Sequence, residues 1–60
     1  MLIKRIFWDV IKTKLTKDEM TELESTVIAT GIIRGGVMIS ENLLNPVLRN
    51  KLGNVLNVHI

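Results

Sequence analysis

The side chains of this chain that could do chemistry are a group of carboxylates and one histidine. Asp18, Glu19, Glu22 and Glu24 crowd into one short segment, where they could hold a divalent cation or act as an acid and a base. The only histidine, His59, lies far from them in the sequence. The carboxylate spacing is that of an exposed helix face, and no nucleophile, base and orienting group occur together. We therefore expect no metal site, no cofactor and no enzymatic activity.

Basic side chains form the second pattern. The formal net charge is +2, but segment 1–17 is a basic block that an acidic patch, segment 18–24, follows directly. The basic block holds Lys4, Arg5, Lys12, Lys14 and Lys17 against Asp9 alone. Such opposed patches steer a charged partner or pair chains head to tail, or they form an ordinary solvated surface biased by helix dipoles.

Size and composition limit what the chain can build. Sixty residues make one small domain, 1–60, with little core, and the absence of cysteine removes disulfides and thiolate ligands. We therefore expect stability to come from helix packing or from a homodimer. The apolar fraction of 47% against 23% charged residues is too high for a disordered chain.

No segment has the pattern of a membrane span or of a signal peptide. The longest apolar run, 27–39, is shorter than the roughly 20 residues that a spanning helix needs, and Arg34 interrupts it. The first residues lack a long apolar region followed by a small-residue cleavage site. We therefore expect a cytoplasmic protein.

The first element that must position the charged residues is an amphipathic helix over 2–15. Apolar residues recur there at spacings of three and four, which predicts a helix with one face in the core. Phe7 and Trp8 are the only aromatic residues, and we expect them to pack in that core. A basic amphipathic helix could instead lie on an anionic membrane surface.

The second element is a helix that begins near Lys17. Thr16 and Glu19 have the spacing of a capping box, in which each side chain bonds the other residue's backbone N–H. Gly31 suits the left-handed residue that follows a helix, so we expect the helix to end near Thr30.

The third element is a helix over 46–52. Asn45-Pro46 is a helix start, because proline is tolerated in the first turn, and we expect a turn over 40–45 before it. Gly53-Asn54 is a stop signal, and the pattern of 55–60 fits an extended segment and the end of a last helix equally well.

Segment 30–40 allows two folds. If Gly31 is a tight corner, a second helix packs against the first and the domain is mainly α, with three or four helices arranged like a helix-turn-helix. If Gly35-Gly36 is a turn between strands, Ile32 and Ile33 pair with segment 37–39, and the domain is α+β with a short hairpin at 31–40. We favour the helical corner.

Several fragments in the expected order resemble the Cro/phage-repressor-like helix-turn-helix family. Segment 15–23, LTKDEMTEL, is similar to the start of that family's second helix, L-S/T-Q-E-E-L-A-E, and segment 30–37, TGIIRGGV, to its turn, T-G-V/I-S-R-x-x-V/I. Glu41-Asn42 with Asn45-Pro46 resembles E-N-G-x-x-N-P, and segment 52–58 resembles a final helix that ends L-x-x-x-L-N-V.

The resemblance implies a small transcriptional regulator that binds duplex DNA as a dimer. Arg34 would reach a base edge or a phosphate from the start of the recognition helix, because guanidinium forms paired hydrogen bonds with guanine or phosphate. Lys12, Lys14 and Lys17 would contact the DNA backbone, and binding would weaken steeply with salt.

Two other functions fit the residues. The chain could be a small protein-interaction module, an inhibitor or assembly factor, whose apolar helix faces complete a core with a second chain. It could also be a membrane-surface amphipathic peptide led by segment 2–15. For an oligomer or partner interface we expect Ile3, Phe7, Trp8, Ile11, Leu56 and Val58.

Overall fold

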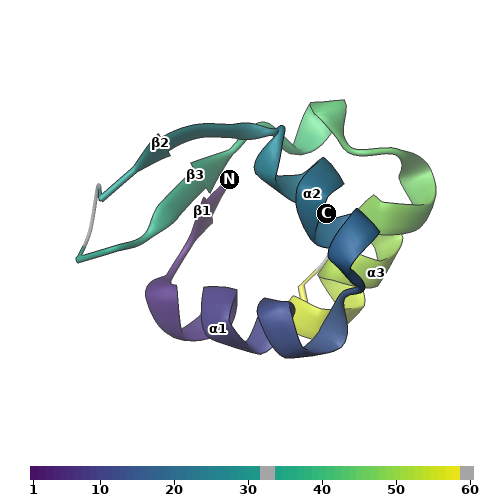
Figure 1. Cartoon of the computed structure of the whole chain (residues 1–60), viewed down its shortest axis with the longest axis horizontal. Coiled ribbons are helices and arrows are strands. Elements are labelled where there is room, and N and C mark those ends of the chain that lie inside the picture. Colours follow the sequence, from purple (N-terminus) through teal and green to yellow (C-terminus); the bar gives the residue numbers. More distant parts are fainter. Residues whose placement is uncertain (32–33, 59–60) are drawn as a thin grey trace.

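The computed structural model describes residues 1–31 and 34–58, and it shows a three-stranded antiparallel sheet packed with three helices (Figure 1). The order along the chain is β1 (Leu2–Ile3), α1 (Arg5–Lys14), α2 (Lys17–Glu24), β2 (Val27–Thr30), β3 (Val37–Ile39), a single 3₁₀ turn (Glu41–Leu43) and α3 (Pro46–Leu56). The expected mainly α, helix-turn-helix-like fold is therefore wrong. The alternative, an α+β domain with a hairpin, is the architecture observed.

The hairpin places β3 in the centre of the sheet, with the strand order β1-β3-β2. Met38 lies opposite Leu2 on one side and opposite Ala29 on the other, and both pairings are antiparallel. The N–H of Gly31 donates to the carbonyl of Gly36 at 2.9 Å, which closes the turn. Gly31 and Gly35 have φ values of 74° and 86°, a backbone region open to glycine at little cost. The expected pairing of Ile32 and Ile33 lies outside the described residues.

Helix α2 is much shorter than the sequence predicted. It ends at Glu24, and Thr26 then turns the chain by donating its buried hydroxyl to the carbonyl of Leu23 at 2.6 Å. The residues that follow are β-branched, and they enter strand β2 with a bulge between Val27 and Ala29. The corner expected at Gly31 does not exist, because Gly31 follows a strand rather than a helix.

Helix α3 begins where predicted but runs further. Asn45 caps it by accepting from the N–H of Leu48 at 2.8 Å, directly before Pro46. Gly53 does not stop the helix, because it is buried within it. The left-handed residue is Asn57 instead, with φ 55°, and Val58 N–H bonds the Gly53 carbonyl at 2.9 Å in a Schellman-type ending. Val55 and Leu56 therefore belong to the end of a last helix, one of the two structures expected for 55–60, rather than to an extended segment.

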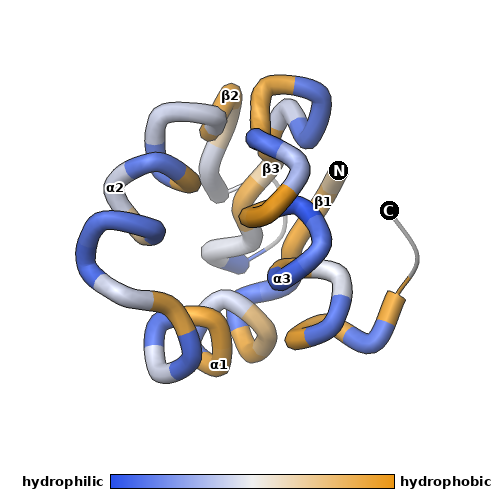
Figure 2. The backbone as a smooth tube through the Cα atoms, turned by 90° about the vertical axis from the view of Figure 1, so that its right-hand side faces the viewer, coloured by the Kyte–Doolittle hydropathy of each residue, from blue (hydrophilic) through white to orange (hydrophobic). Residues whose placement is uncertain are grey.

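The core lies between the sheet and the helices, and every layer contributes to it. Its buried apolar residues come from β1, α1, the junction after it, α2, β3 and the region of α3: Ile3, Ile11, Leu15, Leu23, Val37, Ile39, Leu44, Leu48 and Leu52. Seen from the side, the first turns of α1 have hydrophobic colouring, and hydrophilic colouring dominates where α1 passes into α2 (Figure 2). Much of the apolar surface of α1 is not part of this core.

Candidate functional site

Helix α1 exposes apolar side chains that its amphipathic pattern was expected to bury. Ile11 is fully buried, and Trp8 is half-buried against the core, so this side of the helix faces inward. Ile6, Phe7 and Val10 keep 68%, 45% and 39% of their surface exposed. Because Ile6 and Val10 are four residues apart, they lie on the same side of the helix. We call these three residues the α1 apolar face.

Cations adjoin the α1 apolar face on the side of Phe7. Lys14 lies seven residues after Phe7 and four after Val10, so it is next to both. Arg5 and Lys12 are seven residues apart and share the far side of the helix. Lys4 stands directly before the first turn. All four are exposed, and we call Lys4 and Lys14, which adjoin Phe7, the basic border. Asp9, three residues after Ile6, is the only acidic residue of the helix, so α1 carries a net positive charge.

Apart from Asp9, the carboxylates lie outside α1, and several of them have structural partners. Oε1 of Glu19 accepts from Lys51 Nζ at 2.8 Å and from the N–H of Thr16 at 2.9 Å. These two hydrogen bonds, the one from Lys51 first, hold the pKa of Glu19 below its ordinary value. Glu22 accepts from Asn45 Nδ2. Acidic side chains are therefore concentrated on α2, away from the α1 apolar face.

Glu41 has a structural role next to strand β1. The amino group of Met1 donates to Oε2 of Glu41 and to the carbonyl of Ile39, both at 2.9 Å. The hydrogen bond from this ammonium group is the main reason why the pKa of Glu41 is lowered. The ion pair holds the start of β1 against the end of β3.

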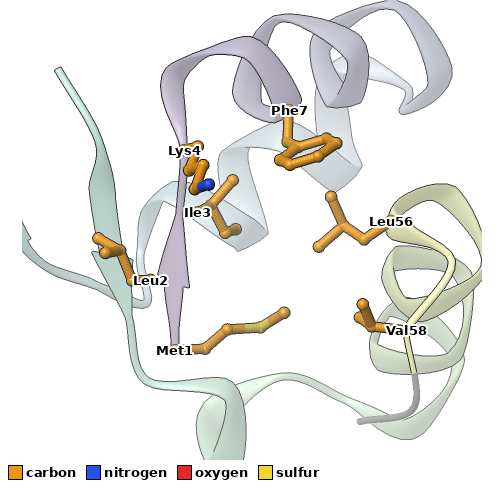
Figure 3. A pocket seen from close by; sticks show the side chains of 7 residues that line it. All are labelled: Met1, Leu2, Ile3, Lys4, Phe7, Leu56 and Val58. Atoms are coloured by element: carbon orange, nitrogen blue, oxygen red, sulfur yellow. The ribbon is translucent and has the colours of Figure 1, made fainter. Parts of the chain in front are cut away.

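A shallow apolar groove of about 180 Å³ adjoins the α1 apolar face. We call it the β1 groove; its lining residues are Met1, Leu2, Ile3, Lys4, Phe7, Leu56 and Val58. In Figure 3 the side chains of Met1, Phe7, Leu56 and Val58 point toward one another across the groove, while Leu2 points away. Lys4 supplies the only charged side chain among these lining residues. The groove and the helix face share Phe7, so they form one continuous surface.

The residues expected at a partner interface divide between this surface and the core. The β1 groove is lined by Phe7, Leu56 and Val58. Ile3 also lines it, although its side chain is almost fully buried. Ile11 belongs to the core alone, because none of its surface is exposed. Trp8 is half-buried and packs against the core.

The residues expected to bind DNA are not gathered at one point. Arg34 lies in the turn of the hairpin, next to Gly35, rather than at the start of a recognition helix. Lys12 and Lys14 lie in the last turn of α1, and Lys17 begins α2. The basic side chain that lies against the hairpin is instead that of Arg5, because a Cβ atom added to Gly35 would be 3.3 Å from Cδ of Arg5.

Sequence reasoning missed the outward direction of Ile6 and Val10. One signal was available, because apolar residues occupy more than half of the positions from 3 to 11. A stripe that buries one side of a helix is narrower than that. Arg5 was counted in the basic block but had no expected role, because only the tertiary structure brings it to the hairpin.

Other kinds of site receive no support from the described geometry. In residues 1–31 and 34–58, no group of three or more potential metal ligands comes together. No helix in the described part of the chain is long and apolar enough to cross a membrane. His59 lies outside the described residues. No family model, no curated protein and no solved structure matches this chain.

Proposed function

We propose that this protein is a small interaction module that binds an acidic partner protein through the α1 apolar face and its basic border. The observation that carries the proposal is the exposure of Ile6, Phe7 and Val10 on one helix, with the basic border beside Phe7. Contiguous exposed apolar side chains with a polar rim are typical of protein-binding surfaces. The cations select an acidic partner and speed its association.

A second copy of the chain is a poorer occupant of the same surface. Symmetric pairing through α1 would bring the basic borders of both copies together, with Asp9 as the only acidic side chain on each helix. Like charges placed opposite each other oppose association. The homodimer expected from size and composition therefore remains an alternative, and the molecular mass in solution tests it.

A lipid surface would also attract a basic, apolar helix face. The protein partner is favoured because the β1 groove continues the α1 apolar face inward beside a strand. A concave apolar surface takes a protruding side chain, which a flat bilayer does not offer. Binding to an acidic protein also does not require positive charge to be spread evenly along α1, as binding to a uniformly anionic lipid surface would.

The experiment compares wild-type protein with variants that change one property of the surface at a time. Ile6→Ser/Val10→Ser removes apolar area and keeps every charge, whereas Lys4→Gln/Lys14→Gln removes charge and keeps the apolar area. Val47→Ser is the matched control, because Val47 is 77% exposed on α3 outside this surface. Each protein is immobilised, and the proteins that it retains are identified. Each retained protein is then purified, and its affinity for the wild type and the variants is measured by titration calorimetry at two salt concentrations.

We expect a partner whose affinity falls by about 10- to 100-fold in Ile6→Ser/Val10→Ser, equivalent to about 1.4–2.8 kcal/mol. The charge variant should bind more weakly at low salt and lose most of the salt dependence. Val47→Ser should bind as the wild type does. A partner that binds Ile6→Ser/Val10→Ser with wild-type affinity would contradict the proposal.

Duplex DNA is a second candidate, and one observation favours it. Arg5 lies against Gly35, the neighbour of Arg34 in the hairpin turn, and both arginines are exposed. Arginine is the residue best suited to phosphate and guanine. Fluorescence anisotropy with a labelled duplex at low and moderate salt tests this function. Binding that weakens with salt and falls in Arg34→Ala, but not in Ile6→Ser/Val10→Ser, would support DNA over an acidic protein.

A further inference from the structure

One edge of strand β1 has no partner strand among the described residues. Met1 and Ile39 exchange two hydrogen bonds, because Ile39 N–H donates to the Met1 carbonyl at 2.8 Å and the Met1 amino group donates to the Ile39 carbonyl at 2.9 Å. In an antiparallel pair, such positions alternate with positions whose N–H and C=O point away from the neighbouring strand. Leu2 is the next position, so its N–H and C=O point away from β3.

This edge opens onto the β1 groove. Strand β1 is at one end of the sheet order β1-β3-β2, and within residues 1–31 and 34–58 no other strand pairs with its outer edge. In Figure 3 the groove lies on the side of β1 opposite β3, between β1 and the end of α3. A polar peptide edge therefore borders an apolar groove that is wide enough for a side chain.

The size and charge of the groove define what fits it. A cavity of about 150 Å³ holds one benzene-sized group, so a groove of about 180 Å³ accepts one leucine or phenylalanine side chain. Lys4 is the charged lining residue, and no acidic side chain lines the groove among the described residues. A ligand with a carboxylate near Lys4 and an apolar group toward Phe7 is complementary to both features.

We infer that an extended segment of the acidic partner adds to the outer edge of β1 as a fourth strand. Its backbone bonds the outward-facing N–H and C=O of Leu2, and one apolar side chain enters the β1 groove. Side chains alternate along a strand, so the next residue of the segment lies on the other face, where its carboxylate pairs with Lys4. This inference rests on the proposed function, because it describes how the same partner is held.

Two other occupants fit less well. A second copy of β1 would bring only two residues, which gives a very short pairing, and it would bring no carboxylate to Lys4. An acyl chain would fill the groove and could place its carboxylate near Lys4. It would leave the N–H and C=O of Leu2 without new hydrogen bonds. The backbone of Leu2 therefore distinguishes a bound peptide from a bound acyl chain.

The test uses a blocked hexapeptide that alternates leucine and glutamate, added to ¹⁵N-labelled full-length protein and followed by NMR. We expect saturable shifts of the Leu2 and Lys4 amides, together with groove residues such as Phe7 and Leu56. The same peptide with all of its backbone nitrogens methylated cannot donate to a strand edge, and it should bind at least about tenfold more weakly. Octanoate at equal concentration should leave the Leu2 amide unchanged.

A matched pair of variants ties the shifts to the groove. Val58→Trp fills the groove from a position that is already half-exposed and should weaken peptide binding at least about tenfold. Val47→Trp adds the same side chain at the other end of α3 and should bind as the wild type does. Equal binding by the methylated peptide, unchanged binding by Val58→Trp, or no shift at millimolar peptide would each overturn the inference.

The outcome is separable from that of the proposed function. If the partner binds Val58→Trp normally but not Ile6→Ser/Val10→Ser, the strand addition is wrong and the proposed function stands. If the partner binds Ile6→Ser/Val10→Ser normally, the proposed function is wrong as well.

Discussion

The side chain of Arg5 lies against Gly35, so that a Cβ atom on Gly35 would be 3.3 Å from Cδ of Arg5. This contact joins the first turn of α1 to the turn of the β2–β3 hairpin, although the two residues are far apart in the sequence. Arg5 therefore lies beside the residue that follows Arg34 in the hairpin turn.

The contact predicts different effects of alanine at the two glycines with positive φ. Gly35→Ala and Gly31→Ala should each lower the free energy of unfolding by about 1–2 kcal/mol, because alanine is strained in the left-handed region. Gly35→Ala should in addition displace the Arg5 side chain, whereas a Cβ atom on Gly31 meets no atom within 4 Å. Chemical denaturation and the NMR signal of the Arg5 Nε–H measure the two effects. An unchanged Arg5 signal in Gly35→Ala would show that the contact is not made in solution.

The capping box of α2 should contribute measurably to stability. Thr16 Oγ1 accepts from the N–H of Glu19 at 3.2 Å, and Thr16→Ala should lower the free energy of unfolding by about 1 kcal/mol. Thr13→Ala is the control, since the Thr13 hydroxyl bonds the Val10 carbonyl within α1 and alanine is the better helix former. Urea denaturation of both variants gives the difference, and equal stabilities would argue against the capping box.

Stability should fall in acid because of Glu19 and Glu41. Both carboxyl groups have a pKa below the ordinary value of 4.5 in the folded protein. A lowered folded pKa adds stability that is present above the unfolded pKa and is lost as the pH falls through the folded pKa. Glu19→Gln/Glu41→Gln should therefore be less stable than wild type at neutral pH and should lose less stability between about pH 5 and pH 3. Thermal melts across this range test the prediction, and parallel acid limbs would contradict it.

Leu52 should be among the most sensitive positions of the chain. It is fully buried in α3, so Leu52→Ala should cost about 2–5 kcal/mol of the free energy of unfolding. A domain of this size has roughly 3–9 kcal/mol in total, so the variant should be close to unfolded at room temperature. Val47→Ala, on the exposed side of the same helix, should change stability by less than about 0.5 kcal/mol. Circular dichroism during denaturation compares the pair.

Local signals in the sequence were enough to place most helix starts. The capping box of Thr16 and Glu19 was predicted from two side chains at a fixed spacing, and it is present. The start of α3 at Asn45-Pro46 was predicted in the same way and is confirmed. These features depend on residues within one turn of each other, so no distant contact can change them.

Segment 25–40 could not be assigned from such signals. Its β-branched residues and glycines suited either a helix end with a corner or a hairpin, and the choice depends on what β3 pairs with. Strand β3 pairs with β1 as well as with β2, so residues from the start of the chain stabilise the hairpin. A contact between segments that far apart leaves no local pattern, and the helical fold was wrongly favoured.

The candidate site, like the fold, was predicted from the sequence only in part. The sequence by itself determined that α1 carries apolar residues and cations at helical spacing, and that the chain lacks cysteine. Only the tertiary structure decided which apolar residues of α1 stay exposed outside the core. The small core is filled by Ile11 and its neighbours, and a helix can turn only one side toward it, so Ile6 and Val10 stay in water. The surface proposed to bind a partner therefore follows from the limited volume of the core, which no local pattern reveals.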